Sequence, residues 1–553
     1  MSDDLAVPGT VRLIDATGVL HAAHGSGQKE IILVPQPTDN PNDPLRWNKG
    51  RKLMAVTINM VWCFFIGAMI SGLSPAYNLI EQDTGISVAD LSTGNGLMYL
   101  FMGWGAVVTQ RIGLDYGRRV TLVASAILVT AMTIWTAFVR SKGEFFANRV
   151  LLGTFTSPQE TLMELIVGDL YFTHERGNYL AVYAWALFAG AFLSPVAAGY
   201  VADELGWRWI QYILTMVGVG LALVTFLCFE ETMFYRTADM YSGDGIEEPA
   251  PNMRVEQLSH DVEEGGLQKG HAYKPRETSE KESSPSIQAA SFAVAETNRT
   301  FAERLKLWGY RHPAQPSSFK AIILPFKLLS FPAVFVSGLL VGGILSWYNV
   351  LGGSLALVLG NPPYNFSADS VGLTYLASLV GVSIGCLISG WPSDKLVVFL
   401  ASRNGGVMEP EQRLWICSLA LLIHPAGCLL YGVGASYHIH WFAVVFGQGL
   451  LCVTLPMGST LAYTYVMDSY GEMAGDGLVS TILVRNTMGF AFGYAVVRMI
   501  NALTLRYAFV LIALLGEAVW VIGMLMILVG KPMRRATARR YWKMVEETGA
   551  TAH

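Results

Sequence analysis

Ionisable side chains interrupt a stretch, Phe145 to Gly177, that is otherwise apolar enough to cross a bilayer. Those within its long apolar part are Arg149, Glu160, Glu164 and Asp169. An ionised side chain at the bilayer centre costs about 2.5–3.5 kcal/mol on insertion scales, so such residues face protein or water. At about 100° per helical residue, Arg149, Glu160 and Glu164 share one face, whereas Asp169 lies on the opposite side near the following loop. The spacing predicts a membrane-spanning helix whose acidic face carries protons; buried structural ion pairs are the alternative interpretation.

Other kinds of chemistry find little support in the sequence. The Gly-Lys pair at Gly530-Lys531 has no GxxxxGK[ST] pattern around it, which argues against an ATP-binding P-loop. The six cysteines lie in apolar runs without CxxC or Cys/His spacing, as is typical of small core residues. His424 lies in an apolar run, and His438 and His440 lie in a short loop; neither pattern indicates a metal site. We therefore expect no enzyme, no cofactor and no metal.

The composition indicates a membrane protein. Of the 553 residues, 52% are hydrophobic and 14% are charged, whereas soluble domains contain about 25% charged residues. The net charge of −4 argues against a nucleic-acid partner. We therefore expect a lipid bilayer around the chain.

Twelve apolar runs are long enough to cross a bilayer. They lie at 53–80, 91–112, 120–139, 145–171, 178–202, 209–229, 332–358, 370–391, 413–434, 441–467, 478–500 and 507–530. This pattern predicts an all-α membrane protein of twelve transmembrane helices, with six-helix halves at 53–229 and 328–530. The remaining segments are predicted to be cytoplasmic: tails at 1–52 and 531–553, and a polar, mostly disordered loop at 230–327.

The placement of Lys and Arg predicts the orientation of the chain. Basic residues gather in the tails and in the loops on the same side, including Arg118, Arg119 and the run from Lys531 to Lys543. The opposite loops hold few, and the positive-inside tendency then places both termini in the cytoplasm. Asn365, in an Asn-Phe-Ser sequon, would lie outside as a candidate glycosylation site. A basic amphipathic pattern at 296–312 predicts a helix on the inner membrane surface, with a solvated helix as the alternative.

Two loops carry related sequence patterns. Gln110–Leu122 reads QRIGLDYGRRVTL and follows the second apolar run, and Ser389–Gly406 follows the eighth. In both places the sequence resembles the major facilitator superfamily, whose loop pattern is roughly GxxxDRxGRR and implies a cytoplasmic gate. The matching residues are Gly117, Arg118 and Arg119 in the first copy, and Gly390 and Asp394 in the second. Gln110 and Leu114 depart from the pattern.

Further matches narrow the resemblance. Arg149–Gly153 resembles the family's helix-four pattern RxxxG, whose arginine is associated with proton coupling. Gly190, Pro195 and Gly199 match part of the helix-five antiporter pattern GxxxGPxxGG, although small residues also let membrane helices approach closely. Other segments resemble the fungal twelve-span drug:proton antiporters, in the branch of histidinol and polyamine carriers: DLYFTHERG, GWRWIQYI and SRNGGVMEPEQRLW.

The resemblance also implies which residues line a central cavity, because helices 1, 4, 7 and 10 of that family surround it. Carried onto this chain, the substrate-cavity candidates are Asn59, Trp62, Tyr183, Trp347, Tyr348, Asn349, Gln448, Arg485 and Asn486. Acids beside aromatic rings suit an organic cation, with ordinary packing as the alternative for each aromatic residue. Arg485 and Glu517 are expected to form a structural pair. Asp169 near Arg118 and Arg119 is expected either to hold a gate closed or to clamp a loop.

Together these features predict a secondary transporter whose two halves rock around a site at the membrane midplane. Arg149, Glu160 and Glu164 would couple protons to the efflux of a cationic or amphipathic small molecule. Proton-coupled uptake of a polyamine-like amine is the alternative, and a non-transporting membrane sensor is the alternative of a different class. We expect a monomer in the plasma membrane.

Overall fold

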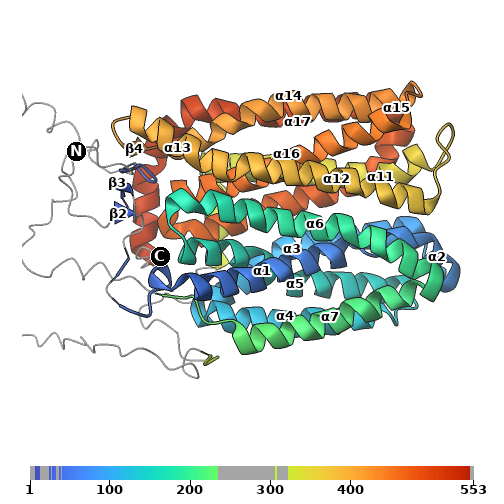
Figure 1. Cartoon of the computed structure of the whole chain (residues 1–553), viewed down its shortest axis with the longest axis horizontal. Helices are drawn as coiled ribbons and strands as arrows, with labels where there is room; N and C mark the ends of the chain where they lie inside the picture. Colours follow the sequence, from blue (N-terminus) through green and yellow to red (C-terminus); the bar gives the residue numbers. More distant parts are fainter. Residues whose placement is uncertain are drawn as a thin grey trace, which may run out of the picture.

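The computed structural model describes residues 7–12, 24–25, 28–32, 37–38, 40–234, 305–307 and 322–548. Its long helices run side by side in one bundle (Figure 1). Helices from the first part of the chain, coloured blue to green, form one group, and those from the last part lie beside them in yellow to red. We call the end of the bundle at which α13 (Trp391–Arg403) lies the α13 end, and the opposite end, with α2 (Tyr77–Thr84), the α2 end.

The first half begins with a short 3₁₀ turn, η1 (Pro44–Arg46). Its remaining elements are α1 (Lys49–Ser71), η2 (Ser74–Ala76), α2, α3 (Val88–Tyr116), α4 (Arg118–Thr136), α5 (Lys142–Leu170), α6 (Thr173–Leu205) and α7 (Trp207–Cys228). Serine and asparagine side chains start several of these helices. Asn48, Ser87 and Ser141 accept hydrogen bonds from the backbone N–H three residues on, which satisfies a donor that the first helical turn leaves open.

The second half has the same general plan. Its elements are α10 (Leu324–Leu328), α11 (Pro332–Leu359), α12 (Ala368–Ser389), α13, η4 (Pro410–Ile416), α14 (Cys417–Cys428), the π-helical η5 (Leu429–Val433), α15 (Gly434–Ser436), α16 (Trp441–Ser469), η6 (Gly471–Met473) and α17 (Ala474–Thr548). Two small antiparallel pairs lie outside the helices: β1 (Val11–Arg12) with β4 (Val407–Met408), and β2 (His24–Gly25) with β3 (Gln28–Ile32).

The prediction of an all-α membrane fold is confirmed. Each of the twelve predicted ranges falls on helical structure, and the last two share α17, whose backbone breaks at Thr504 with φ 65°. Within the described part of the chain, nine helices are long and apolar enough to cross a membrane. The predicted spans outside this group are α3, α5 and the first part of α17. These more polar helices pack against one another.

Several predictions lie outside the described residues. They are the amphipathic helix at 296–312, of which only 305–307 is described, most of the polar loop at 230–327, and much of the N-terminal tail.

Apolar side chains cover the outside of the bundle. Large exposed hydrophobic residues recur along α7, α14 and α17, for example Met216, Leu422 and Leu528. A continuous exposed apolar surface of this kind is unusual on a soluble protein and suits contact with lipid.

Glycines set the closest helix contacts. A Cβ added at Gly190 in α6 would overlap the Phe64 carbonyl oxygen of α1, and one at Gly67 would overlap the Leu187 carbonyl oxygen of α6. Gly153 of α5 likewise lies against the Met98 carbonyl oxygen of α3. Close backbone approach at small residues is the ordinary way in which membrane helices gain van der Waals contact.

The contact between α1 and α6 yields a prediction. Gly190→Val should destabilise the folded protein by about 1–3 kcal/mol or more, because the new side chain must push α1 away. Gly199→Val on the same helix is the matched control, since no other atom lies within 4 Å of a Cβ there. Thermal unfolding of the detergent-purified proteins measures both, and equal loss in the two variants would contradict the packing argument.

Candidate functional site

An ion pair between the two halves lies at the centre of the polar helices. Glu160 of α5 pairs with Arg485 of α17, and both side chains are buried, with exposed fractions of 6% and 7%. Arg485 also donates to the Tyr463 hydroxyl of α16 at 2.7 Å and to Asn486 Oδ1 at 3.1 Å. One guanidinium therefore joins α5 of the first half to α16 and α17 of the second.

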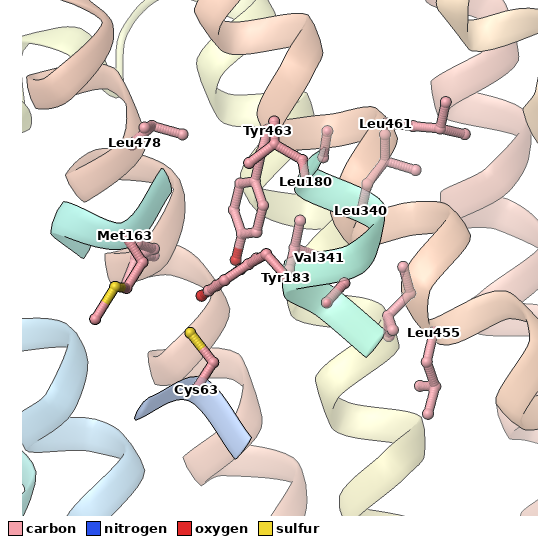
Figure 2. Packing of buried hydrophobic residues seen from close by; sticks show 14 of the residues in the cluster. Cys63, Met163, Leu180, Tyr183, Leu340, Val341, Leu455, Leu461, Tyr463 and Leu478 are labelled. Atoms are coloured by element: carbon pink, nitrogen blue, oxygen red, sulfur yellow. The ribbon is translucent and has the colours of Figure 1, made fainter. Parts of the chain in front are cut away.

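Glu164 lies one helical turn beyond Glu160 and is fully buried. Among the residues that the structure describes, neither of its carboxylate oxygens meets hydrogen-bond geometry with a donor. Tyr183 of α6, whose hydroxyl donates to the Glu160 carbonyl oxygen at 3.4 Å, and Cys63 of α1 are electrostatic neighbours. Figure 2 shows the hydroxyl ends of Tyr183 and Tyr463 and the Cys63 sulfur pointing toward one region. A carboxylate in such a place is costly, whereas the neutral acid costs far less.

Arg149 is separated from both acids. It lies eleven positions before Glu160 along α5, which corresponds to roughly 16 Å of helix rise. Its guanidinium contacts the Met98 sulfur at 3.8 Å and lies 4.7 Å from the centre of the Phe145 ring. In the described part of the chain it has no carboxylate partner, so the predicted seam is divided into two separate sites.

Some predicted cavity residues lie between the halves. Tyr348 of α11 shares a hydrogen bond of 3.1 Å with Ser71 of α1, and its ring packs edge-on against Phe192 of α6. Asn486 of α17 packs against Gly103 of α3. These contacts continue the interface from Arg485 toward the α2 end.

Asn59 and Asn349 differ in the hydrogen bonding of their side-chain amides. Both amide atoms of Asn59, which is buried in α1, have no hydrogen-bond partner within the described residues. Asn349 donates to the Gly489 carbonyl oxygen at 3.1 Å, which ties α11 to α17 inside the second half.

Three other residues predicted to line the cavity make these contacts inside one half. The Trp62 indole donates to the Thr225 hydroxyl of α7. Trp347 packs against Phe492 and His424 of the second half. The Gln448 amide donates to the Ser378 hydroxyl at 2.8 Å and to the Thr374 carbonyl oxygen at 3.2 Å, both in α12.

The predicted ion pair between Arg485 and Glu517 is wrong. Arg485 pairs with Glu160 instead, and Glu517 is a half-buried residue on the last membrane-spanning part of α17. A partner 325 positions away in the sequence leaves no trace in helical periodicity.

A charge cluster joins the halves at the α13 end. Arg413 forms ion pairs of 2.7 Å with both Asp394 and Asp468 in the second half. The same guanidinium donates to the Thr173 carbonyl oxygen of α6 at 3.0 Å, and Asp394 accepts from the Asn178 backbone N–H of α6 at 3.0 Å. Asp394 therefore lies at a contact between the halves.

Sequence reasoning missed Arg413 and Asp468. A signal for Asp468 was present, since Asp468-Ser-Tyr470 at the end of α16 has the same Asp-x-Tyr spacing as Asp169-Leu-Tyr171 at the end of α5. The two aspartates occupy corresponding places in the two halves.

Asp169 belongs to a clamp inside the first half. Arg118 Nε lies 3.4 Å from Asp169 Oδ2, and the backbone N–H groups of Arg118 and Arg119 each donate to Glu231 at 3.0 Å. Thr232 also donates to Asp169 at 3.3 Å. These contacts fasten α4 and α5 to the segment after α7, and the role of the pair as a gate or as a static clamp stays a prediction.

The departure at Gln110 has a structural role. Its amide donates to the Gly475 carbonyl oxygen of α17 at 2.9 Å, across the interface between the halves. Beside it, burial raises the pKa of Asp476 to about 7, and Arg111 of the first half opposes that change. The first half thus makes this contact with a neutral amide at the pattern position that Gly390 occupies in the second half.

The remaining predicted positions have plain structural settings. Gly117, with φ 115°, links α3 to α4, and Gly390 precedes α13 and lies against Ala181 and Asn178 of α6. Pro195 lies inside α6. Asn365 is exposed in the turn between α11 and α12, at φ 50°.

Known proteins resemble this chain in sequence and in fold. The family model described as the Major Facilitator Superfamily matches residues 60–496. The chain belongs to this superfamily. It is therefore an integral multi-pass membrane protein and a transporter of a small-molecule substrate, not an enzyme.

Similar proteins are fungal transporters. An uncharacterized MFS-type transporter of Schizosaccharomyces pombe is 27% identical over 97% of this chain and 94% of its own length. The protein HOL1 of Saccharomyces cerevisiae is 26% identical over 93% of this chain and 92% of its own length. A probable efflux pump, mfs2, of Aspergillus flavus is 25% identical over 76% of this chain and 88% of its own length.

A solved structure shares the fold. The human organic anion transporter MFSD10 superposes with a TM-score of 0.54 at 15% identity, covering 85% of this chain and 99% of that chain.

The ion pair between the halves yields a second prediction. Arg485→Met should destabilise the protein by about 3–5 kcal/mol, because it leaves the Glu160 charge buried without a partner. Adding Glu160→Gln to that variant should restore much of the loss. Arg498→Met, at an exposed arginine on the same helix, is the control and should have little effect. Thermal unfolding measures all of these variants, and strictly additive losses would argue against the pair.

Proposed function

We propose that this transporter couples protons to the efflux of cationic or amphipathic organic molecules, with Glu164 as the proton carrier. The observation that carries the proposal is the full burial of Glu164, which has no ion-pair partner among the described residues, one turn from an ion pair between the halves. Such a carboxyl group needs either a proton or a cation to neutralise it.

In the proposed mechanism, a proton and the organic cation compete for the Glu164 carboxylate. When the site opens to one side, Glu164 takes a proton and the bound organic cation leaves. When the site opens to the other side, the proton leaves and the next cation pairs with the carboxylate. In both states the Glu164 charge is neutralised, either by a proton or by the organic cation. The two halves therefore rock only when one of these is bound.

The Glu160–Arg485 pair has a different role in this proposal. Because it joins α5 to α17, it holds the two halves together at the midplane, and its geometry changes whenever they rock. The Tyr463 hydroxyl, also bonded to Arg485, keeps the guanidinium oriented. Tyr183 and Tyr348, at the interface, supply aromatic surface for the cation.

Two observations bear on the direction of transport. One relative is named a probable efflux pump, and the part-matched antiporter pattern in α6 points the same way. However, Gly190 is already explained by its contact with α1, and Ser194 donates to the Ala68 carbonyl oxygen at 2.9 Å. Proton-coupled uptake of a polyamine-like amine is therefore the second candidate.

We further propose that the α13 end faces the cytoplasm of a cell whose plasma membrane holds the protein as a monomer. Supporting this orientation, the last part of α17, at the α13 end, carries Lys531, Arg535, Arg539 and Lys543. Asn365 would then be exposed outside the cell and available for glycosylation.

A flux measurement tests the proposal. Radiolabelled spermidine and tetraphenylphosphonium are supplied to sealed vesicles that contain the purified protein, under an imposed pH gradient. Glu164→Gln should reduce gradient-driven flux by about tenfold or more, while the variant stays folded in the membrane. Glu517→Gln is the matched control, because it neutralises another acid in a membrane span away from the interface.

The outcomes separate the alternatives. The sign of the flux distinguishes export from uptake. Undiminished flux in both Glu160→Gln and Glu164→Gln would overturn the proton-carrier proposal, and no flux of either probe through the unaltered protein would argue against organic cations as the substrate.

A further inference from the structure

The N-terminal segment Val7–Arg12 lies against the α13 end of the second half. Its last two residues form β1, which pairs antiparallel with Val407–Met408 of β4. Pro8 is buried and its neighbours are half-buried. The segment therefore extends a strand of the second half, a mode of peptide binding in which backbone pairing supplies affinity.

Polar groups hold the segment in place. The Thr10 hydroxyl donates to Glu409 at 3.1 Å, and the Pro8 carbonyl oxygen accepts a hydrogen bond from Arg534. Arg534 is itself buried and pairs with Glu409 at 3.0 Å and with Glu411 at 2.6 Å. The two acids thus orient the Arg534 guanidinium, which donates to the segment.

Gly9 fixes where the segment lies. Its φ is +80°, and a Cβ at this position would lie 2.5 Å from the Asp468 carbonyl oxygen and 2.7 Å from the Ser469 Cα. A larger residue would be strained in this conformation and would also collide with the end of α16. The backbone of the segment therefore rests directly on Asp468.

The same aspartate takes part in the contact between the halves. The Asp468 backbone contacts Gly9, and the Asp468 side chain pairs with Arg413. Arg413 in turn donates to Thr173 of the first half. Asp468 and Arg413 therefore connect the docked segment to the interface between the halves.

We propose that the N-terminal segment 7–12 is a latch: its docking beside Asp468 favours the conformation in which the two halves meet at the α13 end. The partner of this surface is the chain's own N-terminus, which continues into α1 of the first half. The proposal goes beyond transport chemistry and holds for any substrate or direction of flux.

The coupling is reciprocal. If docking favours contact between the halves by some factor, separation of the halves weakens docking by the same factor. Release of the segment is then both a cause and a sign of opening at the α13 end.

Distance measurement tests the latch in the full-length protein. Spin labels are placed at Glu175→Cys in α6 and Lys395→Cys in α13, which are exposed positions on the two halves. The six native cysteines are free, and all but the half-buried Cys228 are buried. Gly9→Val should raise the ratio of separated to joined halves by about fivefold or more.

The controls isolate docking from strain and from folding. Gly85→Val introduces a side chain at a similar positive φ, where no atom lies within 4 Å of the Cβ, and should leave the distances unchanged. A chain that lacks residues 2–12 should behave like Gly9→Val, and a peptide of residues 1–14 added to it should restore the joined state. Unchanged distances in both Gly9→Val and the shortened chain, or no response to the peptide, would overturn the latch.

Discussion

The ion pair between Glu160 and Arg485 is the interaction on which the centre of the bundle depends. Lipid-embedded helices gain nothing from hiding apolar surface from lipid, so their association rests on packing and on polar contacts. Here one guanidinium satisfies an acid on α5, a hydroxyl on α16 and an amide on α17. The polar character of α3, α5 and the first part of α17 follows from this arrangement, because each of them meets protein instead of lipid on its polar face.

Charges at the α13 end divide into two kinds. The Arg118, Asp169 and Glu231 group fastens elements of the first half to one another. The Asp394, Arg413 and Asp468 group also reaches the first half. Related sequence patterns in the two halves therefore have different roles. The first-half group fastens elements within one half, whereas the second-half group makes a contact that must break when the halves separate.

The membrane explains how much of this architecture the sequence predicts. Bilayer thickness fixes the length of an apolar run, so the spans can be located from the sequence to within a few residues. The acidic face of α5 followed from helical spacing alone. Which side of a helix meets which neighbour is harder to read. Trp62 and Gln448 lie on helices that are buried on several sides, so periodicity does not select a face. The partner of Glu160 and the role of Arg413 depend on contacts between the halves, which no local pattern records.

The long sequence separation within the central ion pair has a consequence for how the protein is made. Arg485 is synthesised 325 residues after Glu160, a delay of roughly 15–65 s at ordinary rates of translation. During that interval the partner of Glu160 in the central ion pair does not yet exist. The first half of this chain must therefore hold Glu160 in place without its partner until α17 has been made.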